Sequence, residues 1–275
     1  MRIALLRRGR PSWIRSIGYH PALVNEEAVH FTLACVEIAL AIPTVVALIW
    51  TTAPYGRHAR DGWGPTIPAR LGWVLMETPA VLLYVGIFAL GEHRLETAPL
   101  SLLAFWQLHY VHRTFVFPFR MRADGKRMPL SIPLMAIVFN CLNAYVNARW
   151  ISHLGSYPDA WLTDPRFVIG GAVFLVGMAI NVHADTVLMN LRKPGETGYK
   201  IPKGGLYRFI SSPNYFGEIL EWTGWAIMTW SIAGVAFAVY TAANLAPRAF
   251  SNHRWYLEKF PDYPAGRKAL IPFVI

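Results

Sequence analysis

The stretch YFGEILEWTGWAIMTWSIAGVAFAVYTAANLA, residues 215–246, decides the class of fold. Glu218 and Glu221 are its only charged residues, and their spacing of three places both on one face of a helix. A charge at membrane depth costs about 2.5–3.5 kcal/mol on insertion scales, so such residues usually have a task. The pair therefore predicts a polar site among apolar helices.

The composition of the whole chain favours a membrane protein. Of its 275 residues 54% are hydrophobic and 15% are charged, and the mean hydropathy is +0.32. In soluble domains about a quarter of the residues are charged. The net charge of +10 is spread among short segments between apolar runs, which fits membrane topology better than nucleic-acid binding. Cys35 and Cys141 lie in apolar stretches and form no Cys-x-x-Cys metal motif.

Apolar runs of about 20 residues, the length that crosses a bilayer, fall near 28–50, 71–91, 98–119, 130–151 and 166–189. The region 206–250 allows one long span with an interfacial helix, or two short tilted helices that turn near Ser231–Gly234. With seven spans, 18 Lys and Arg residues lie on one face and 8 on the other, whereas six spans divide them 13 and 13. This bias predicts an all-α integral membrane protein with seven transmembrane helices, the N-terminus outside and the C-terminus cytoplasmic. The five arginines of the N-terminal segment count against that orientation.

The chain is expected to form one domain. Residues 1–27 are a basic N-terminal segment without the pattern of a cleaved signal peptide, and residues 28–275 form a single helical membrane domain. The longest polar connections, Thr51–Pro68 and Leu191–Pro213, are too short for a separate domain.

Polar residues inside the apolar runs are candidate site residues. Glu77 is either an end-of-span residue that reaches the interface, or a buried acid that keeps its proton and offers an O–H to a carbonyl oxygen. In the run 98–119, His109, His112 and Arg113 share one helix face, with Gln107 and Tyr110 nearby. Two histidines without a third ligand nearby do not indicate a metal site.

Asn181 and Asp185 lie one helical turn apart near the end of the run 166–189, as a polar helix end or as part of a site. The following segment, 190–205, combines cations with glycines, which suits either a phosphate cradle or an ordinary positive-inside loop. It contains neither a dinucleotide-binding Gly-x-Gly-x-x-Gly after a strand nor a P-loop. Arg248, Asn252 and Tyr256, spaced by four, form a stripe that faces an anionic ligand or lipid head groups.

Six motifs, in order over most of the chain from about Tyr55, resemble the steroid 5α-reductases, the membrane 3-oxo-5α-steroid 4-dehydrogenases, as a bacterial-type homologue. The motifs are LHYVHRTFV (108–116), YPDAWLTDPRF (157–167), GMAINVHAD (177–185), LRKPGE (191–196), PNYFGEILEW (213–222) and HRWYLEKFPDYP (253–264), and the ending RKALIPF (267–273) completes them. The first fifty residues carry little of the resemblance.

The resemblance implies a seven-helix membrane enzyme that uses NADPH to reduce the Δ4 double bond of a 3-oxo-steroid. In the family a glutamate on the second helix and a tyrosine on the third hold the 3-oxo group, and Glu77 and Tyr110 occupy these positions. Met76 stands where the family often has Gln, which puts the identity of the steroid or other lipophilic enone in question. The catalytic and cofactor half is expected at about 108–275. Its implied cofactor contacts are Asn181, Asp185, Arg192, Tyr199, Lys200, Asn214, Glu218, Arg248, Asn252 and Tyr256.

Two of these contacts depart from the family pattern. Lys200 stands where Arg is common and loses the fork geometry of a guanidinium, while Asn252 stands where His is common. Lys126 is a further candidate phosphate contact. With Glu218 read as a cofactor contact, Glu221 becomes a structural residue that orders neighbouring cations or polar groups.

The expected surroundings follow from the same resemblance. We expect a monomer among membrane lipids, without metal or nucleic acid, in the bacterial inner membrane or the endoplasmic reticulum according to its source. The alternatives are a related sterol or enone double-bond reductase, or an S-adenosylmethionine-dependent enzyme like the isoprenylcysteine methyltransferases. A lipid-binding or transport protein is a third class, and the lack of internal repeats counts against transport.

Overall fold

A computed structural model describes residues 25–123, 125–193 and 195–275 of the chain. The basic segment expected at 1–27 therefore lies outside the described residues, apart from its last three. The helices are α1 (Glu26–Trp50), α2 (Ala69–Ala89), α3 (Thr97–Val111), α4 (Phe117–Arg120), α5 (Ser131–Arg149), α6 (Pro165–Asn190), α7 (Pro213–Thr229) and α8 (Ile232–Lys259). Shorter helical turns are η2 (Gly56–His58), η3 (His112–Val116), η4 (Trp150–Leu154), η5 (Asp159–Thr163) and η6 (Gly205–Arg208). The strands are β1 (Thr66–Pro68) and β2 (Arg127–Pro129), which pair antiparallel with Ile67 opposite Met128.

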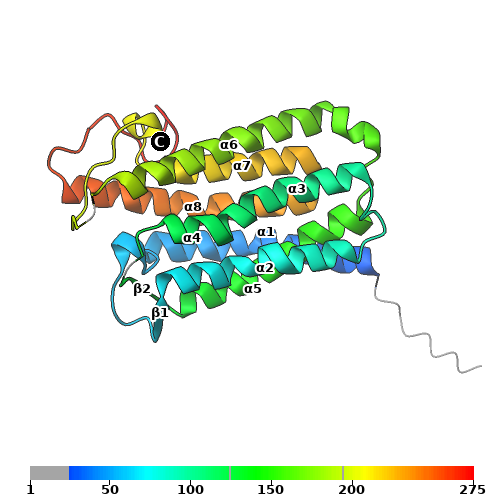
Figure 1. Cartoon of the computed structure of the whole chain (residues 1–275), viewed down its shortest axis with the longest axis horizontal. Helices are drawn as coiled ribbons and strands as arrows, with labels where there is room; N and C mark the ends of the chain where they lie inside the picture. The colour runs from blue at the N-terminus through cyan, green and yellow to red at the C-terminus, as the bar shows by residue number, and fades with distance from the viewer. Residues whose placement is uncertain (1–24, 124, 194) are drawn as a thin grey trace, which may run out of the picture.

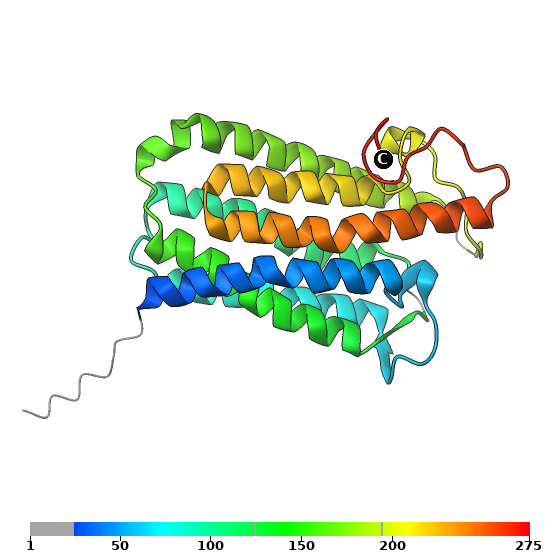
Figure 2. The same cartoon turned by 180° about the vertical axis from the view of Figure 1, so that it is seen from behind.

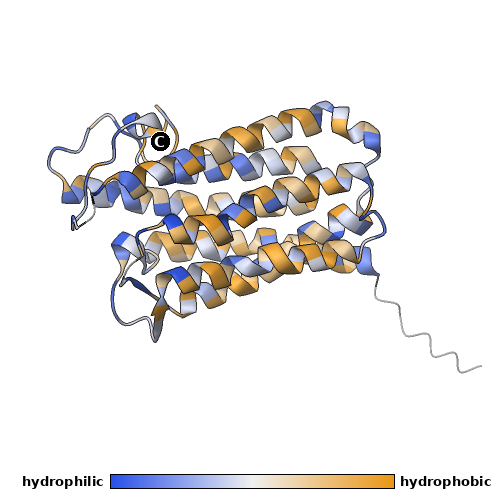
Figure 3. Cartoon of the chain, viewed as in Figure 1, coloured by the Kyte–Doolittle hydropathy of each residue, from blue (hydrophilic) through white to orange (hydrophobic). Residues whose placement is uncertain are grey.

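The long helices lie side by side along one direction (Figure 1). We call the end of the bundle that carries β1 and β2 the sheet end. Seen from behind, α1 lies beside α8 and α5 (Figure 2). Apolar residues extend along the helices, and hydrophilic residues gather at the sheet end (Figure 3). Within the described residues, four helices are long and apolar enough to cross a membrane: α1, α2, α5 with its continuation to Leu154, and α6.

Side-chain caps explain where several helices begin. The Asn25 side chain accepts a hydrogen bond from the Glu27 amide (3.0 Å), and Asp164 accepts one from the Arg166 amide (2.8 Å), with Pro165 in the first turn. The region 206–250 forms two helices, α7 and α8, with the turn near Ser231, which is the second of the two arrangements that the sequence allows. Trp230 ends α7 in a left-handed conformation (φ 45°), and Ser231 caps α8.

Helices α6 and α7 touch through their backbones, because glycines occupy both sides of the contact. A Cβ added to Gly177 would lie 2.3 Å from the Glu221 amide nitrogen, and one added to Gly217 would lie 2.6 Å from the Asn181 amide nitrogen. Small residues permit such approach between membrane helices. The contact brings Asn181 of α6 directly against the first turns of α7.

An aromatic core joins α3 to its neighbours. Trp106 is fully buried and contacts Tyr84, Trp222 and Trp225, with ring centroids 4.4 to 5.4 Å apart. Its indole N–H donates to the Ala80 carbonyl oxygen of α2 at 2.8 Å. Large aromatic side chains dominate the burial energy of such a core, and a buried indole N–H needs a partner. The core therefore fixes α3 relative to α2 and α7.

Candidate functional site

Glu77 and Tyr110 stand at the same level of the bundle. The Trp106–Ala80 hydrogen bond joins α2 and α3, which run in opposite directions. Tyr110 lies one helical turn beyond Trp106 on α3, and Glu77 lies one turn before Ala80 on α2. Both positions are on the side away from the loop that joins the two helices. Tyr110 is 3% exposed, and its hydroxyl interacts electrostatically with the Glu77 carboxyl group. The two residues proposed to hold a carbonyl oxygen thus lie at one level of the bundle interior.

A residue that sequence reasoning did not assign supports Glu77. The Asn140 side-chain amide of α5 donates to the Met76 carbonyl oxygen at 2.6 Å and reaches the Glu77 carboxylate at 3.4 Å. Asn140 is 6% exposed. Its position as a polar residue inside the apolar run 130–151 was the only available signal.

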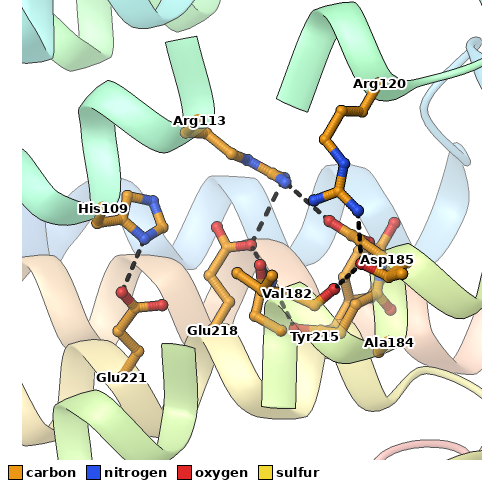
Figure 4. A network of polar contacts seen from close by, with 12 residues as sticks. His109, Arg113, Arg120, Val182, Ala184, Asp185, Tyr215, Glu218 and Glu221 are labelled. Atoms are coloured by element: carbon orange, nitrogen blue, oxygen red, sulfur yellow. Dashed lines mark hydrogen bonds and ion pairs between the residues drawn. The ribbon is translucent and has the colours of Figure 1, made fainter. Parts of the chain in front are cut away.

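Four of the predicted cofactor residues meet around Arg113. Its guanidinium lies 3.1 Å from the Asp185 carboxylate and 3.6 Å from the Glu218 carboxylate. Asn214 donates to Asp185 (3.0 Å), and Asn181 donates to Glu218 (3.2 Å). Figure 4 shows Arg113 reaching between the two acids, which come from α6 and α7.

The sequence interpretation noted Arg113 but gave it no role. It is the only charged residue in the run 98–119, which was the signal available. Arg113 belongs to the π-helical turn η3, a kind of turn that often occurs at functional sites. Its guanidinium also lies over the rings of Trp73 (4.9 Å) and Phe117 (4.4 Å), which fixes its direction. Arg113 is thus the central cation of this network.

Glu221 has the polar partner that its structural interpretation requires. Its carboxylate Oε1 lies 2.8 Å from His109 Nδ1, and both side chains are buried. His109 and Arg113 are four residues apart, and Glu221 and Glu218 are three apart, so two polar contacts join the α3–η3 segment to α7.

A second cluster lies at the sheet end around the stripe of α8. Arg248 donates to the Tyr55 hydroxyl and contacts the Tyr215 hydroxyl at 3.3 Å. Asn252 Oδ1 accepts from His58 Nε2 at 3.1 Å. The stripe Arg248, Asn252 and Tyr256 therefore faces protein, namely the segment between α1 and α2.

The same segment contributes a cation to this cluster. The Arg57 guanidinium lies 4.5 Å from the ring centroid of Tyr256, and its buried Nη1 has no hydrogen-bond partner in the described part of the chain. Sequence reasoning assigned no role to Tyr55, Arg57 or His58, and a short run of aromatic and basic residues is a weak signal. Burial, together with repulsion from Arg57 and Arg60, lowers the pKa of His58 below its ordinary value. The hydrogen bond with Asn252 opposes this shift but does not cancel it.

The segment between α6 and α7 holds the remaining predicted contacts. Arg192 Nη1 donates to the Gly198 carbonyl oxygen at 2.8 Å, and Lys200 Nζ lies 2.5 Å from the Glu196 carboxylate. The hydrogen bond from Lys200 lowers the pKa of Glu196. The Tyr199 ring packs edge-on against Trp255, with centroids 4.8 Å apart, which brings the segment next to Tyr256. Lys200 is half-exposed and turned to Glu196, so the structure does not bring it to the Arg113 network.

These groups suit a large anionic ligand with planar rings. Cations and aromatic rings alternate at the sheet end, and amide and carboxylate groups follow deeper in the bundle around Arg113. Guanidinium groups bind phosphates, and aromatic faces pack against planar rings. The buried Nη1 of Arg57 offers a donor to such an anion.

Comparison with known proteins gives the family. The family model of the 3-oxo-5-alpha-steroid 4-dehydrogenases matches residues 126–275. The steroid 5-alpha-reductase DET2 of Gossypium hirsutum is 47% identical over 250 residues, which cover 89% of this chain and 96% of the relative. The 3-oxo-5-alpha-steroid 4-dehydrogenase 1 of Homo sapiens is 46% identical over 253 residues, 91% of this chain and 97% of the relative. The chain therefore belongs to the 3-oxo-5-alpha-steroid 4-dehydrogenase family.

Proposed function

We propose that this chain reduces the Δ4 double bond of a 3-oxo-Δ4-steroid to the 5α-3-oxosteroid, with NADPH as reductant. Its family and relatives make it a membrane oxidoreductase that acts on a CH–CH bond. The observation that carries the residue assignment is that Glu77 and Tyr110 lie at one level of the bundle, next to the Arg113 network.

The proposed chemistry asks little of the protein except well-placed donors. When bound, NADPH supplies the hydride that adds to C5, and the electrons of the double bond move to the 3-oxygen. The Tyr110 O–H and the protonated Glu77 donate hydrogen bonds to that oxygen as its negative charge grows. Such donors stabilise the transition state more than the ground state. C4 then takes a proton from solvent, which completes the saturated ketone.

The residues around Arg113 and at the sheet end fit a dinucleotide. We assign the amides and carboxylates of Asn181, Asp185, Asn214 and Glu218 to the uncharged, hydrogen-bonding parts of the cofactor. The cations Arg57, Arg192 and Arg248 are assigned to its phosphates, and Tyr256 to its ring systems. The unpartnered, buried Nη1 of Arg57 supports this assignment, because a buried cationic donor favours an anionic partner. Tyr199, Lys200 and Asn252 complete the proposed cofactor contacts, with Lys126 as a further phosphate contact.

The proposed topology has seven transmembrane helices in one domain, 28–275, with its catalytic and cofactor half at about 108–275. Within the described residues, seven helices have 15 residues or more, which supports the count. The basic residues of the sheet end favour its cytoplasmic location and an outside N-terminus. We propose a monomer that contacts lipid and no nucleic acid, in the bacterial inner membrane or the endoplasmic reticulum.

The test is turnover by the purified protein. With NADPH and a Δ4-3-oxosteroid we expect loss of nicotinamide absorbance and formation of the 5α product. Glu77→Gln and Tyr110→Phe should lower kcat by about 10²-fold or more, with little change in the Kd of NADPH. Wild-type turnover in both variants would overturn the assignment of donors. Reduction at another double bond would identify a related sterol or enone reductase, and binding of S-adenosylmethionine in place of NADPH would identify a methyltransferase-like enzyme.

A further inference from the structure

The inward face of α1 carries an acid that the proposed chemistry does not use. The buried residues of α1 form one stripe: His30, Ala34, Glu37 and Ala41. Glu37 is 0% exposed, and neither of its carboxylate oxygens has a hydrogen-bond partner in the described residues. Its neighbours on the stripe, Ala34 and Ala41, have only methyl groups. A buried polar group without a partner is costly, so this position calls for a hydrogen-bonding group opposite Glu37.

The packing of α1 on α5 fixes the level of Glu37 in the bundle. The two helices run in opposite directions, and the His30 ring stacks on Trp150 with centroids 5.4 Å apart. One turn further along α1, Ala34 packs against Val146. Continuing this register by one more turn brings Glu37 to the level of Asn143.

Asn143 offers the complementary half of a binding site. It is 0% exposed, and its Oδ1 accepts a hydrogen bond from Asn147 at 2.8 Å. Its Nδ2 has no hydrogen-bond partner among the residues that the structure describes. An unpartnered donor and an unpartnered acid therefore occupy the same level of two neighbouring helices.

This pair belongs to the same interior as the proposed reduction site. Asn140, one turn from Asn143 on the same face of α5, contacts Glu77. The Glu37 carboxylate also interacts electrostatically with the Tyr110 hydroxyl. Glu37 and Asn143 thus lie beside the region of Glu77 and Tyr110, one helical turn further from the sheet end.

We propose that Glu37 and Asn143 form a second polar subsite, which binds a hydroxyl group at carbon 17 of the steroid. A hydroxyl satisfies both partners, because its oxygen accepts from Asn143 Nδ2 and its hydrogen is donated to Glu37. This subsite is displaced from Glu77 by one helical turn along the bundle, about 5 Å. Across the bundle it is displaced by one interhelical spacing, about 8–10 Å. That separation is comparable to the length of four fused rings. The inference rests on the proposed function, since it assumes a steroid whose 3-oxygen is held by Glu77 and Tyr110.

The experiment compares two Δ4-3-oxosteroids that differ only in a hydroxyl at carbon 17. Equilibrium binding of each is measured with the purified full-length protein, and NADPH-dependent turnover is measured separately. For Glu37→Leu and Asn143→Leu we expect about tenfold weaker binding of the hydroxylated steroid, and less than about a twofold change for the other. Glu37→Gln keeps hydrogen-bonding atoms and should retain most of the affinity. Glu27→Leu, an exposed acid of the same helix, is the matched control.

The outcomes separate the two proposals. Unchanged discrimination in Glu37→Leu and Asn143→Leu, or equal losses for both steroids, would overturn the subsite, as would failure of the wild-type protein to prefer the hydroxylated steroid. Absence of NADPH-dependent reduction of either steroid by the wild-type protein would contradict the proposed function, whatever the binding result. The melting temperature of each variant shows whether a loss reflects misfolding, and recovery in Glu37→Gln excludes that explanation.

Discussion

His109 on α3 and Glu221 on α7 form a buried pair, with Nδ1 2.8 Å from Oε1 and the glutamate 0% exposed. The other carboxylate oxygen of Glu221 is buried without a partner among the described residues. The His109 ring also packs edge-on against Tyr110, with centroids 4.9 Å apart. The pair therefore links the packing of α7 to the position of Tyr110.

Removal of the Glu221 carboxyl group should destabilise the protein. Glu221→Leu leaves the buried His109 Nδ1 without its hydrogen-bond partner, and we expect a loss of about 1–3 kcal/mol in the free energy of unfolding. Glu221→Gln keeps hydrogen-bonding atoms at this position and should cost less. Thermal unfolding in detergent measures both variants, and an equal loss in the two would refute hydrogen bonding as the cause.

A methyl group in the α6–α7 contact should loosen the Arg113 network, which we propose to bind the cofactor. In Gly217→Ala the new Cβ collides with the backbone of Asn181. The clash can be relieved only if α6 and α7 move apart. We expect a destabilisation of about 1–3 kcal/mol and a weaker affinity for NADPH. Gly86→Ala is the control, because a Cβ at Gly86 has no neighbouring atom within 4 Å. A melting temperature of Gly217→Ala equal to that of the control would contradict this account.

Replacement of Arg113 should weaken NADPH binding more than it destabilises the fold. In Arg113→Met the acids Asp185 and Glu218 lose their shared counter-charge and would repel each other and the phosphates of the cofactor. We expect the Kd of NADPH to rise at least about tenfold. Isothermal titration with NADPH measures the change, and Arg94→Met, at the other end of the bundle, serves as control. Unaltered affinity in Arg113→Met would show that the network is not part of the proposed cofactor site.

Low pH should weaken the contact between α8 and the segment that joins α1 to α2. The pKa of His58 is lowered, so the folded protein holds His58 neutral, while the unfolded chain binds a proton below about pH 6.5. Stability is therefore expected to fall as the pH drops from about 6.5 through the folded pKa. The melting temperature between pH 8 and 5 should decline less in His58→Gln than in the wild-type protein. Parallel declines would show that another group is responsible.

Local sequence patterns predicted the helices well. Four of the five long apolar runs each match one helix within a few residues, and the run 98–119 is divided among α3, η3 and α4. The turn near Ser231 was left open by hydropathy, because both helices that flank it are apolar. The left-handed Trp230 and the Ser231 cap resolve it, and neither conformation is evident from a hydropathy pattern. The π turn at His112–Val116, which contains Arg113, was missed for the same reason.

The amino-acid sequence by itself determined the class of protein, the apolar helices, and most of the residues proposed for the site. It did so because burial in a membrane leaves few reasons for a polar side chain, and each exception is visible against an apolar background. Which of these exceptions meet was decided by the tertiary structure alone. Backbone contact at Gly177 and Gly217 brings Asn181 to Glu218, and antiparallel packing brings Glu37 to the level of Asn143. Such pairings depend on helix register and crossing, which involve residues far apart in the chain and leave no periodic signal in it.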